Sequence, residues 1–232
     1  PTGLDRVSFQ YDEMLSSEIR NMYGNGCPYL FATTARLEKE KNLDFLFQGT
    51  ARLRDILGQD FRLMVIGDGT ERRHLEELAR MLGISRQIVF TGKIENTRVR
   101  HYLNAADAFL FASKSETQGI VLLEAMAAGC PVAAVRASGV VDVVRQGING
   151  YMTEEAPEAF AAAAARLVLE RGVWSGMSEE ARKTAELYES GRIAALAAEQ
   201  YGLMTGQKED AGYEEHGKGM LVPSILRLFK AA

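Results

Sequence analysis

Short apolar segments alternate with longer amphipathic ones along the chain from residue 29 onward. The short segments are rich in β-branched and aromatic residues, which predicts strands at Tyr29–Thr33, Arg62–Ile66, Ile88–Thr91, Ala108–Ala112 and Pro131–Val135. Each is followed by a segment of helical periodicity, an order typical of a parallel sheet with right-handed crossovers and helices on both faces. We therefore predict an α/β fold with a Rossmann-like, doubly wound parallel sheet.

The amphipathic segments show which side chains the predicted helices bury. Apolar residues recur at helical spacing in three of them, at Leu43, Leu46, Phe47, Leu53 and Leu57, at Leu75, Leu78, Ala79 and Leu82, and at Val99, Tyr102, Leu103 and Ala106. Gly83 stands where the second helix would end in a left-handed turn, and Asn96 is the expected N-cap of the third. We expect His101 on a helix surface, and Phe109, Phe111 and Met126 in the core.

After Pro157 the helical patterns follow one another, and no further strand is predicted. One stripe at helical spacing is Phe160, Ala164, Leu167 and Val168, and a second, mostly apolar one is Ile193, Leu196, Ala197, Gln200 and Met204. Residues 205–219 are rich in Gly, Glu and Lys, which predicts a solvated linker, and residues 221–230 predict a short helix that packs on another part of the protein. We therefore predict one Rossmann-like, ligand-binding α/β domain over residues 1–204, followed by a linker and a short C-terminal helix over residues 205–232. The Pro-Thr-Gly start is a poor beginning for an independent domain, so we expect a fragment.

Composition restricts the classes of function. Of the 232 residues 47% are hydrophobic and 25% charged, and the formal net charge of −4 argues against a nucleic-acid partner. The apolar runs are shorter than the ~18 residues that cross a bilayer, so we expect a cytoplasmic protein, with the inner face of the membrane as an alternative location. Cys27 and Cys130 lack CxxC spacing, which favours a reducing compartment. The three histidines are scattered, and neither a metal ion nor another cofactor is predicted.

Ligands of open α/β sheets bind beyond the carboxyl ends of the strands, and three loops are expected there. The loop after the first predicted strand, residues 35–42, carries the cations Arg36 and Lys41. The second loop is Gly92-Lys93-Ile94, and the third covers residues 113–119. Two cations alone are most often part of a solvated loop, but their place after the first strand favours a site.

Two glutamates flank a predicted helix start near Gly119. Glu116 precedes the helix and Glu124 lies inside it, roughly 5–7 Å further along the axis, so one ligand can touch both. Gly119 lets a ligand approach the N–H groups of Ile120 and Val121, and helix N-termini attract phosphate. Carboxylates accept hydrogen bonds from sugar hydroxyls, so the arrangement suits a ligand with sugar, diphosphate and sugar in series. On spacing alone, however, such acids usually serve the helix dipole and solubility.

Cations must supply most of the affinity for a diphosphate beside two carboxylates. A helix N-terminus contributes about 0.3–1 kcal/mol, and ~2 kcal/mol at most when partly buried. Each charge-assisted hydrogen bond from Arg or Lys contributes about 1.5–3 kcal/mol. Arg36 and Lys41 are the obvious donors.

Several motifs together carry a resemblance to a known family. Glu116-Thr-Gln-Gly-Ile-Val-Leu-Leu-Glu124 resembles the E-x7-E motif of retaining, nucleotide-sugar-dependent glycosyltransferases of family 4 (group 1), which have the GT-B fold. Residues 129–132, 147–151, 35–41 and 1–5 resemble that family's G-x-P-V, G-x-N-G-[YF/L], G-R-L-x-x-x-K and P-x-G-[IV]-D motifs. The resemblance covers about residues 1–204 and implies the donor-binding, C-terminal domain of such an enzyme.

The resemblance implies a role for each site residue. Glu116 would contact hydroxyls of the transferred sugar, and Glu124 would bind the nucleotide ribose. Arg36 and Lys41 would bind the diphosphate and stabilise it as it leaves. The remaining donor contacts that it implies are Thr117, Gln118, Gly119, Ile120 and Val121, with Lys93 and Ile94 near the base. Such enzymes need no metal, and the sequence contains no D-x-D.

The resemblance has departures, and other functions stay open. Ala35 and Asn42 replace glycines that are usual around the cationic loop, which predicts a stiffer loop, and Gln118 replaces a common phenylalanine. The Ser-Glu-Thr-Gln-Gly version of the motif points to a glycolipid or cell-envelope polysaccharide acceptor, and a UDP-sugar of hexose type is the favoured donor. We expect the lipid or saccharide acceptor to bind a missing N-terminal domain, and the full enzyme to associate peripherally with a membrane. The alternatives are a nucleotide-sugar-modifying enzyme, such as an epimerase or hydrolase, and a non-catalytic binding module of the same fold.

Overall fold

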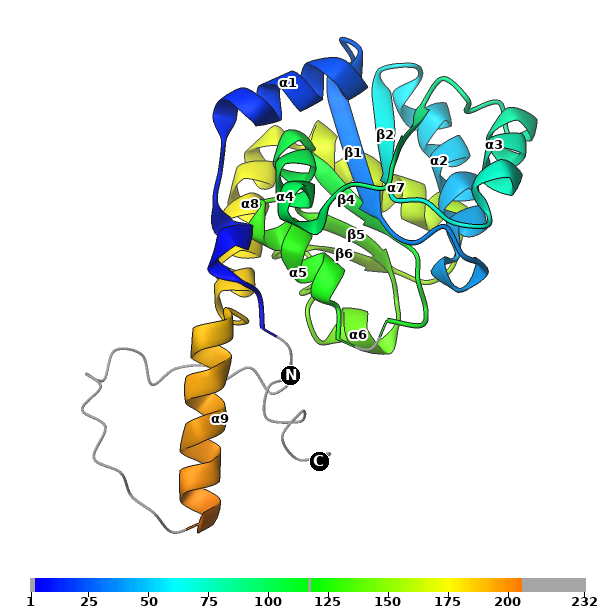
Figure 1. Ribbon diagram of the computed structural model, residues 1–232. Helices are drawn as coiled ribbons and strands as arrows, with labels where there is room; N and C mark the ends of the chain where they lie inside the picture. Colours follow the sequence, from blue (N-terminus) through cyan, green and yellow to red (C-terminus); the bar gives the residue numbers. More distant parts are fainter. Residues whose placement is uncertain (1–2, 117, 206–232) are drawn as a thin grey trace.

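The computed structural model describes residues 3–116 and 118–205 (Figure 1). The strands are β1 (Tyr29–Thr34), β2 (Phe61–Ile66), β3 (Ile88–Gly92), β4 (Ala108–Phe111), β5 (Val132–Val135) and β6 (Gly150–Thr153). The α-helices are α1 (Glu13–Gly24), α2 (Leu43–Leu57), α3 (Arg72–Met81), α4 (Asn96–Ala105), α5 (Ile120–Ala127), α6 (Ser138–Val141), α7 (Pro157–Leu169), α8 (Arg171–Glu186) and α9 (Ser190–Thr205). Two short 3-10 helices are η1 (Arg6–Phe9) and η2 (Lys39–Lys41).

The strands form one parallel sheet in the order β3-β2-β1-β4-β5-β6. All five predicted strands are confirmed, each within one residue at either end, and the predicted α/β class is correct. The sequence did not predict β6, which pairs Gly150 with Val132 of β5. This strand is short, lies at the sheet edge and begins inside the Gly147–Tyr151 motif, whose glycines and asparagine indicate a turn rather than a strand.

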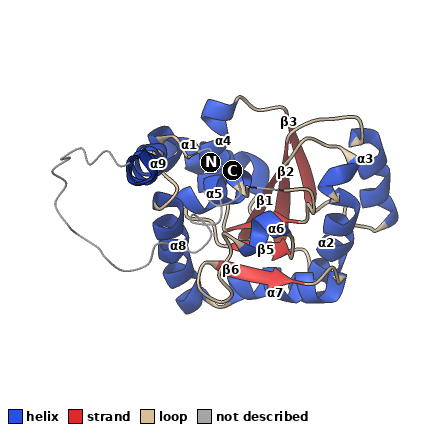
Figure 2. Ribbon diagram, turned by 90° about the horizontal axis from the view of Figure 1, so that it is seen from below, coloured by secondary structure: helices blue, strands red, loops and turns tan. Residues whose placement is uncertain are grey.

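Side chains alternate between two cores, one on each face of the sheet. The core beneath α1, α4, α5 and α8 receives Leu30, Met64, Phe109 and Val132. The core beneath α2, α3 and α7 receives the sequence neighbours of these four residues, one from each strand. They are Phe31 of β1, Leu63 of β2, Leu110 of β4 and Ala133 of β5. Figure 2 shows these two groups of helices on opposite sides of the strands. Because both faces are covered, the strands are apolar at nearly every position.

The predicted helical stripes are largely buried, but three details differ from the expectations. The N-cap of α4 is Glu95, and Asn96 is its first helical residue. His101 is buried, at 8% exposure, and not on the surface, because α4 packs against α1. Helix α1 itself was missed, since its sequence is mostly polar, although Asp12 caps it by accepting a hydrogen bond from the Leu15 N–H at 3.0 Å. Gly83 has φ +70° after α3, as predicted.

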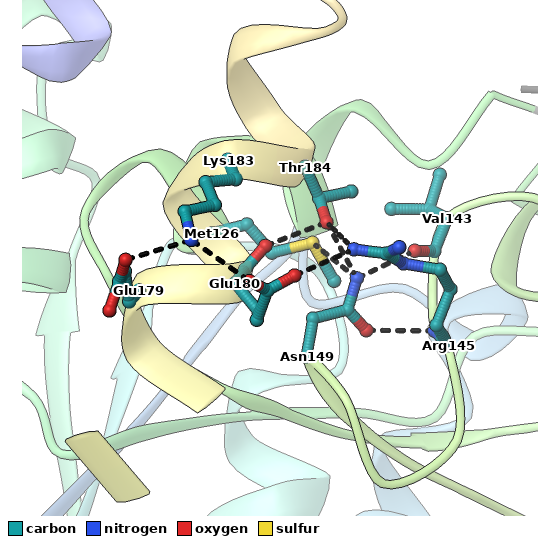
Figure 3. A network of polar contacts seen from close by, with 8 residues as sticks. All are labelled: Met126, Val143, Arg145, Asn149, Glu179, Glu180, Lys183 and Thr184. Atoms are coloured by element: carbon teal, nitrogen blue, oxygen red, sulfur yellow. Dashed lines mark hydrogen bonds and ion pairs between the residues drawn. The ribbon is translucent and has the colours of Figure 1, made fainter. Parts of the chain in front are cut away.

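A buried polar network fastens the turn before β6 to α8 (Figure 3). The Asn149 side chain is fully buried; it donates to the Val143 carbonyl and the Thr184 hydroxyl, both at 3.0 Å, and accepts from the Arg145 N–H at 2.7 Å. The Arg145 guanidinium continues the network to Glu180 at 3.3 Å. The asparagine of the G-x-N-G motif therefore has a structural role, because its hydrogen bonds connect the turn before β6 to α8.

Helix α9 extends away from the body of the domain (Figure 1), and Ile193 near its start is buried in the same core cluster as Leu4. The predicted linker lies outside the described residues except for Thr205, the last residue of α9, and so does the predicted helix at 221–230. Among the residues that the structure describes, no helix combines the length and the apolar character needed to span a membrane.

Candidate functional site

A pocket of about 200 Å³ opens at the carboxyl edge of the sheet between β1 and β4. The strand order reverses here, because the chain leaves β1 toward β2 and leaves β4 toward β5, so the two loops diverge. Arg36 and Lys41 line the pocket from the β1 side, and Glu116 and Val121 line it from the β4 side. The structure thus brings together the three residues predicted as catalytic with one predicted donor contact.

The cationic loop, residues 35–42, is held against the turn that follows β2. Leu37 is fully buried, and its N–H donates to the Asp68 carbonyl at 3.1 Å. The Glu38 carboxylate accepts hydrogen bonds from the hydroxyl and N–H of Thr70, at 2.7 and 3.4 Å, and these bonds lower the pKa of Glu38. The loop is therefore ordered by its own buried and paired residues, which leaves its cations available.

The two cations differ in their surroundings. Arg36 is exposed, and its Nη2 lies 3.7 Å from Oε1 of Glu40, a separation at which an exposed pair is worth ~1 kcal/mol or less. Lys41 is half-buried. Ser113, which was not predicted as a site residue, also lines the pocket, and its hydroxyl donates to the Glu40 carbonyl at 3.4 Å. Its signal was a hydroxyl directly after a buried strand.

Helix α5 begins with a backbone geometry that only glycine adopts easily. Gly119 has φ +65°, and a Cβ there would lie 2.8 Å from the Gly139 carbonyl oxygen. Its N–H donates to Oε1 of Glu116 at 3.1 Å, so this donor, expected to assist a phosphate, is already paired with the glutamate. Ile120 and Val121 are the first two residues of α5, where helix N–H groups lack intrahelical acceptors.

Glu124 lies one turn into α5, on a half-buried side of the helix. Within the described residues its carboxylate makes no hydrogen bond or ion pair, and burial raises its pKa. A half-buried carboxylate without a partner costs free energy unless a ligand satisfies it. It is not among the residues lining the 200 Å³ pocket, which ends at Val121.

The other predicted contacts are more dispersed. Lys93 is exposed after β3, and Ile94 is partly buried against the core; neither lines the pocket. Gln118 is exposed, and Thr117 lies outside the described residues. Lys93 and Ile94 do lie in a loop at the carboxyl edge of the sheet, but their role at the base stays a prediction.

Metal-binding potential can be assessed for most of the chain. In residues 3–116 and 118–205, no three His, Cys, Asp or Glu side chains gather closely enough to hold a metal ion. Cys130 is fully buried, and burial raises the pKa of its thiol to about 12, so it acts as a small apolar core residue. The expectation that no metal or cofactor is needed stays a prediction.

Fold and site together define a doubly wound α/β domain with a cationic pocket at its topological switch point. The sequence model of the family described as "Glycosyl transferases group 1" matches residues 18–185. The chain therefore belongs to the group 1 glycosyltransferases, as its motifs indicated.

Curated relatives agree with this family. The chain is 29% identical over 197 residues to N-acetyl-alpha-D-glucosaminyl L-malate synthase of Bacillus anthracis, a match to 84% of this chain and 49% of that protein. It is 36% identical over 141 residues to alpha-monoglucosyldiacylglycerol synthase of Streptococcus pneumoniae, covering 58% and 31%. The chain thus spans about half or less of the lengths of these relatives.

Solved structures confirm the fold as that of a GT-B C-terminal domain. Anabaena HepE in complex with UDP-glucose superposes with a TM-score of 0.77 at 20% identity, over 87% of this chain and 56% of that one. The C-terminal domain of the group 1 protein LpcC from Francisella tularensis gives a TM-score of 0.70 at 22% identity, over 81% of this chain and 99% of that domain. At such identities the likeness concerns the fold alone.

Proposed function

We propose that this chain is the donor-binding domain of a retaining glycosyltransferase that transfers a hexose-type sugar from a UDP-sugar to a glycolipid or cell-envelope polysaccharide. Arg36 and Lys41 bind the diphosphate and stabilise the charge that develops on it as the sugar leaves. Glu124 accepts hydrogen bonds from the ribose, and Glu116 contacts the transferred sugar. These cations take the part that a metal ion plays in other transferases, so the reaction needs no metal.

The observation that carries this proposal is the pairing of charges around one switch point. Two cations and one carboxylate line the pocket, and a second carboxylate, which has no partner among the described residues, lies one turn further along α5. A diphosphate flanked by two hydroxylated groups satisfies all four side chains at once. An ordinary helix start would leave Glu124 half-buried without a partner.

The donor and acceptor classes rest on the relatives. Structures named as complexes with UDP or UDP-glucose share the fold, which supports a uracil nucleotide. The S. pneumoniae relative is named for a glycolipid product, and a Rhizobium meliloti relative, 33% identical over 150 residues, is named for lipopolysaccharide core biosynthesis. These names favour a lipid-linked or envelope acceptor. We further propose that the enzyme works in the cytoplasm, at the inner face of the membrane.

Calorimetric titration of the chain with UDP, GDP and ADP tests the proposal. We expect UDP to bind most tightly, and we expect the Arg36→Ala and Lys41→Ala variants to weaken UDP while leaving uridine, which lacks the diphosphate, unchanged. If none of the three nucleotides binds, the proposal is wrong. If ADP or GDP binds more tightly, only the donor class changes.

A further inference from the structure

The residue after Lys41 connects three loops at the carboxyl edge of the sheet. The Asn42 side-chain amide donates to Oε1 of Glu155 at 2.8 Å and to the Ala112 carbonyl at 3.3 Å. The other carboxylate oxygen of Glu155 accepts from the Lys114 ammonium. The Asn42–Glu155–Lys114 bridge thus links the loop after β1 with those after β4 and β6.

The backbone of Asn42 explains why this bridge acts on Lys41. Asn42 has φ 54° and ψ 37°, the left-handed conformation; its N–H donates to the Lys39 carbonyl, which ends η2, and its carbonyl accepts from Leu46, which begins α2. It occupies the N-cap position of α2, yet its side chain does not cap the helix. The side chain points across to Glu155 instead, so the peptide that joins Lys41 to Asn42 is fixed from both sides.

A glycine at position 42 would adopt the same backbone conformation without strain. It would lack the amide, so it could not reach Glu155 or Ala112. The asparagine therefore does more than tolerate the left-handed backbone conformation, because its side chain also ties the loop to Glu155 and Ala112. The hydrogen bonds from Lys114 and Asn42 also lower the pKa of Glu155, so its carboxylate stays charged to a lower pH than that of a free glutamate.

We propose that Asn42 and Glu155 are positioning residues that hold Lys41 at the pocket for the diphosphate of the donor. Lys41 reaches the pocket on a flexible four-carbon side chain, and a backbone that is already fixed where this side chain begins leaves less freedom for binding to remove. This inference rests on the proposed function, because the benefit appears only when a diphosphate binds.

Amide hydrogen exchange of the ligand-free chain tests the restraint itself. In Asn42→Gly and Glu155→Ala the amide of Lys41, which donates to the Glu38 carbonyl at 3.0 Å, should exchange roughly 3- to 10-fold faster. Glu154→Ala is the matched control: Glu154 is the adjacent acid, but it pairs with Arg136 at 2.9 Å. Unchanged exchange at Lys41 in both bridge variants, or an equal increase in the control, would overturn the proposal.

A double-mutant cycle tests whether the bridge acts through Lys41. Asn42→Gly alone should raise the Kd for UDP roughly 3- to 10-fold, whereas Asn42→Gly combined with Lys41→Ala should bind UDP no more weakly than Lys41→Ala alone. Glu155→Gln keeps a carbonyl acceptor for Asn42 and should restore most of the affinity that Glu155→Ala loses. Additive effects of the two substitutions would mean that Asn42 does not position Lys41, and the proposal would fall.

The two experiments separate the two claims. If wild type binds no nucleotide, the proposed function is wrong. The exchange experiment still tests the restraint in that case, and Lys41 exchange that is as slow in the bridge variants as in wild type would show that the bridge does not hold Lys41. If wild type binds UDP but the cycle is additive, the proposed function stands and the positioning role alone is wrong.

Discussion

Replacing Glu124 by glutamine should make the protein more stable and a poorer binder at the same time. The side chain keeps its size and loses its charge. Because the wild-type carboxylate is half-buried and unpaired among the described residues, we expect the variant to gain about 0.5–2 kcal/mol in free energy of unfolding at pH 7. Higher stability together with weaker binding is expected when a carboxylate serves ligand binding at the expense of stability.

The pH dependence follows from the direction of the pKa shift. Burial raises the pKa of Glu124 in the folded state, so the folded state holds its proton more tightly than the unfolded state does. Wild-type stability from this group is therefore present below the unfolded-state pKa of about 4.3 and is lost as the pH rises through the folded-state pKa. Glutamine does not titrate, so the advantage of the variant should vanish below about pH 4 and be complete at neutral pH.

The same substitution should weaken UDP, because hydrogen bonds from ribose hydroxyls to a charged acceptor are worth about 1.5–3 kcal/mol, or roughly 10- to 150-fold in Kd. Urea denaturation at pH 4 and pH 7 measures the stability, and calorimetry measures the affinity. Glu18→Gln is the control, since Glu18 is exposed on α1. A variant that is less stable at pH 7, or that binds UDP as tightly as wild type, would refute the reasoning.

Two further predictions concern the loops around the site, and a third concerns the turn before β6. Arg36→Ala should raise the Kd for UDP about 10-fold by calorimetry, because it removes a charge-assisted bond to the diphosphate. Its exposed pair with Glu40 at 3.7 Å is worth ~1 kcal/mol or less, so a larger loss in the free energy of unfolding would contradict this. Gly119→Ala should cost about 1–3 kcal/mol in urea denaturation, more than Gly147→Ala, since both have positive φ but a Cβ meets a neighbouring atom only at Gly119; equal costs would mean that the close approach is relieved. Asn149→Ala should lower the free energy of unfolding by about 2–4 kcal/mol, because it leaves buried hydrogen-bonding groups without a partner. Gln146→Ala, on the exposed side of the same turn, should lower it by under ~1 kcal/mol. Similar losses in the two variants would show that the network in Figure 3 does not stabilise the fold.

The strands of the sheet could be predicted from the sequence because they are buried on both faces. Continuous apolar segments such as Ala108–Phe111 are bounded by turns and leave little ambiguity. The edge strand β6 and the helix α1 were missed for the opposite reason. Gly150 and the polar residues of α1 give weak local signals, and tertiary contacts decide their structure.

The sequence predicted which residues lie at the edge of the sheet near the site, but not the contacts between the loops that carry them. Arg36, Lys41 and Glu116 could be assigned to one edge because parallel strands end together, and the pocket does join them. Contacts between loops far apart in the chain could not be read from periodicity. Asn42 and Glu155, 113 residues apart, meet only because β1 and β6 end at the same side of the sheet.

The most direct test of the account is a crystal structure of the chain with a bound UDP-sugar. We predict that the diphosphate lies between Arg36 and Lys41 in the pocket at the end of β1, and that the ribose hydroxyls donate to the Glu124 carboxylate. A nucleotide bound elsewhere on the domain, or bound in this pocket with Glu124 still unpaired, would contradict the assignment of these residues.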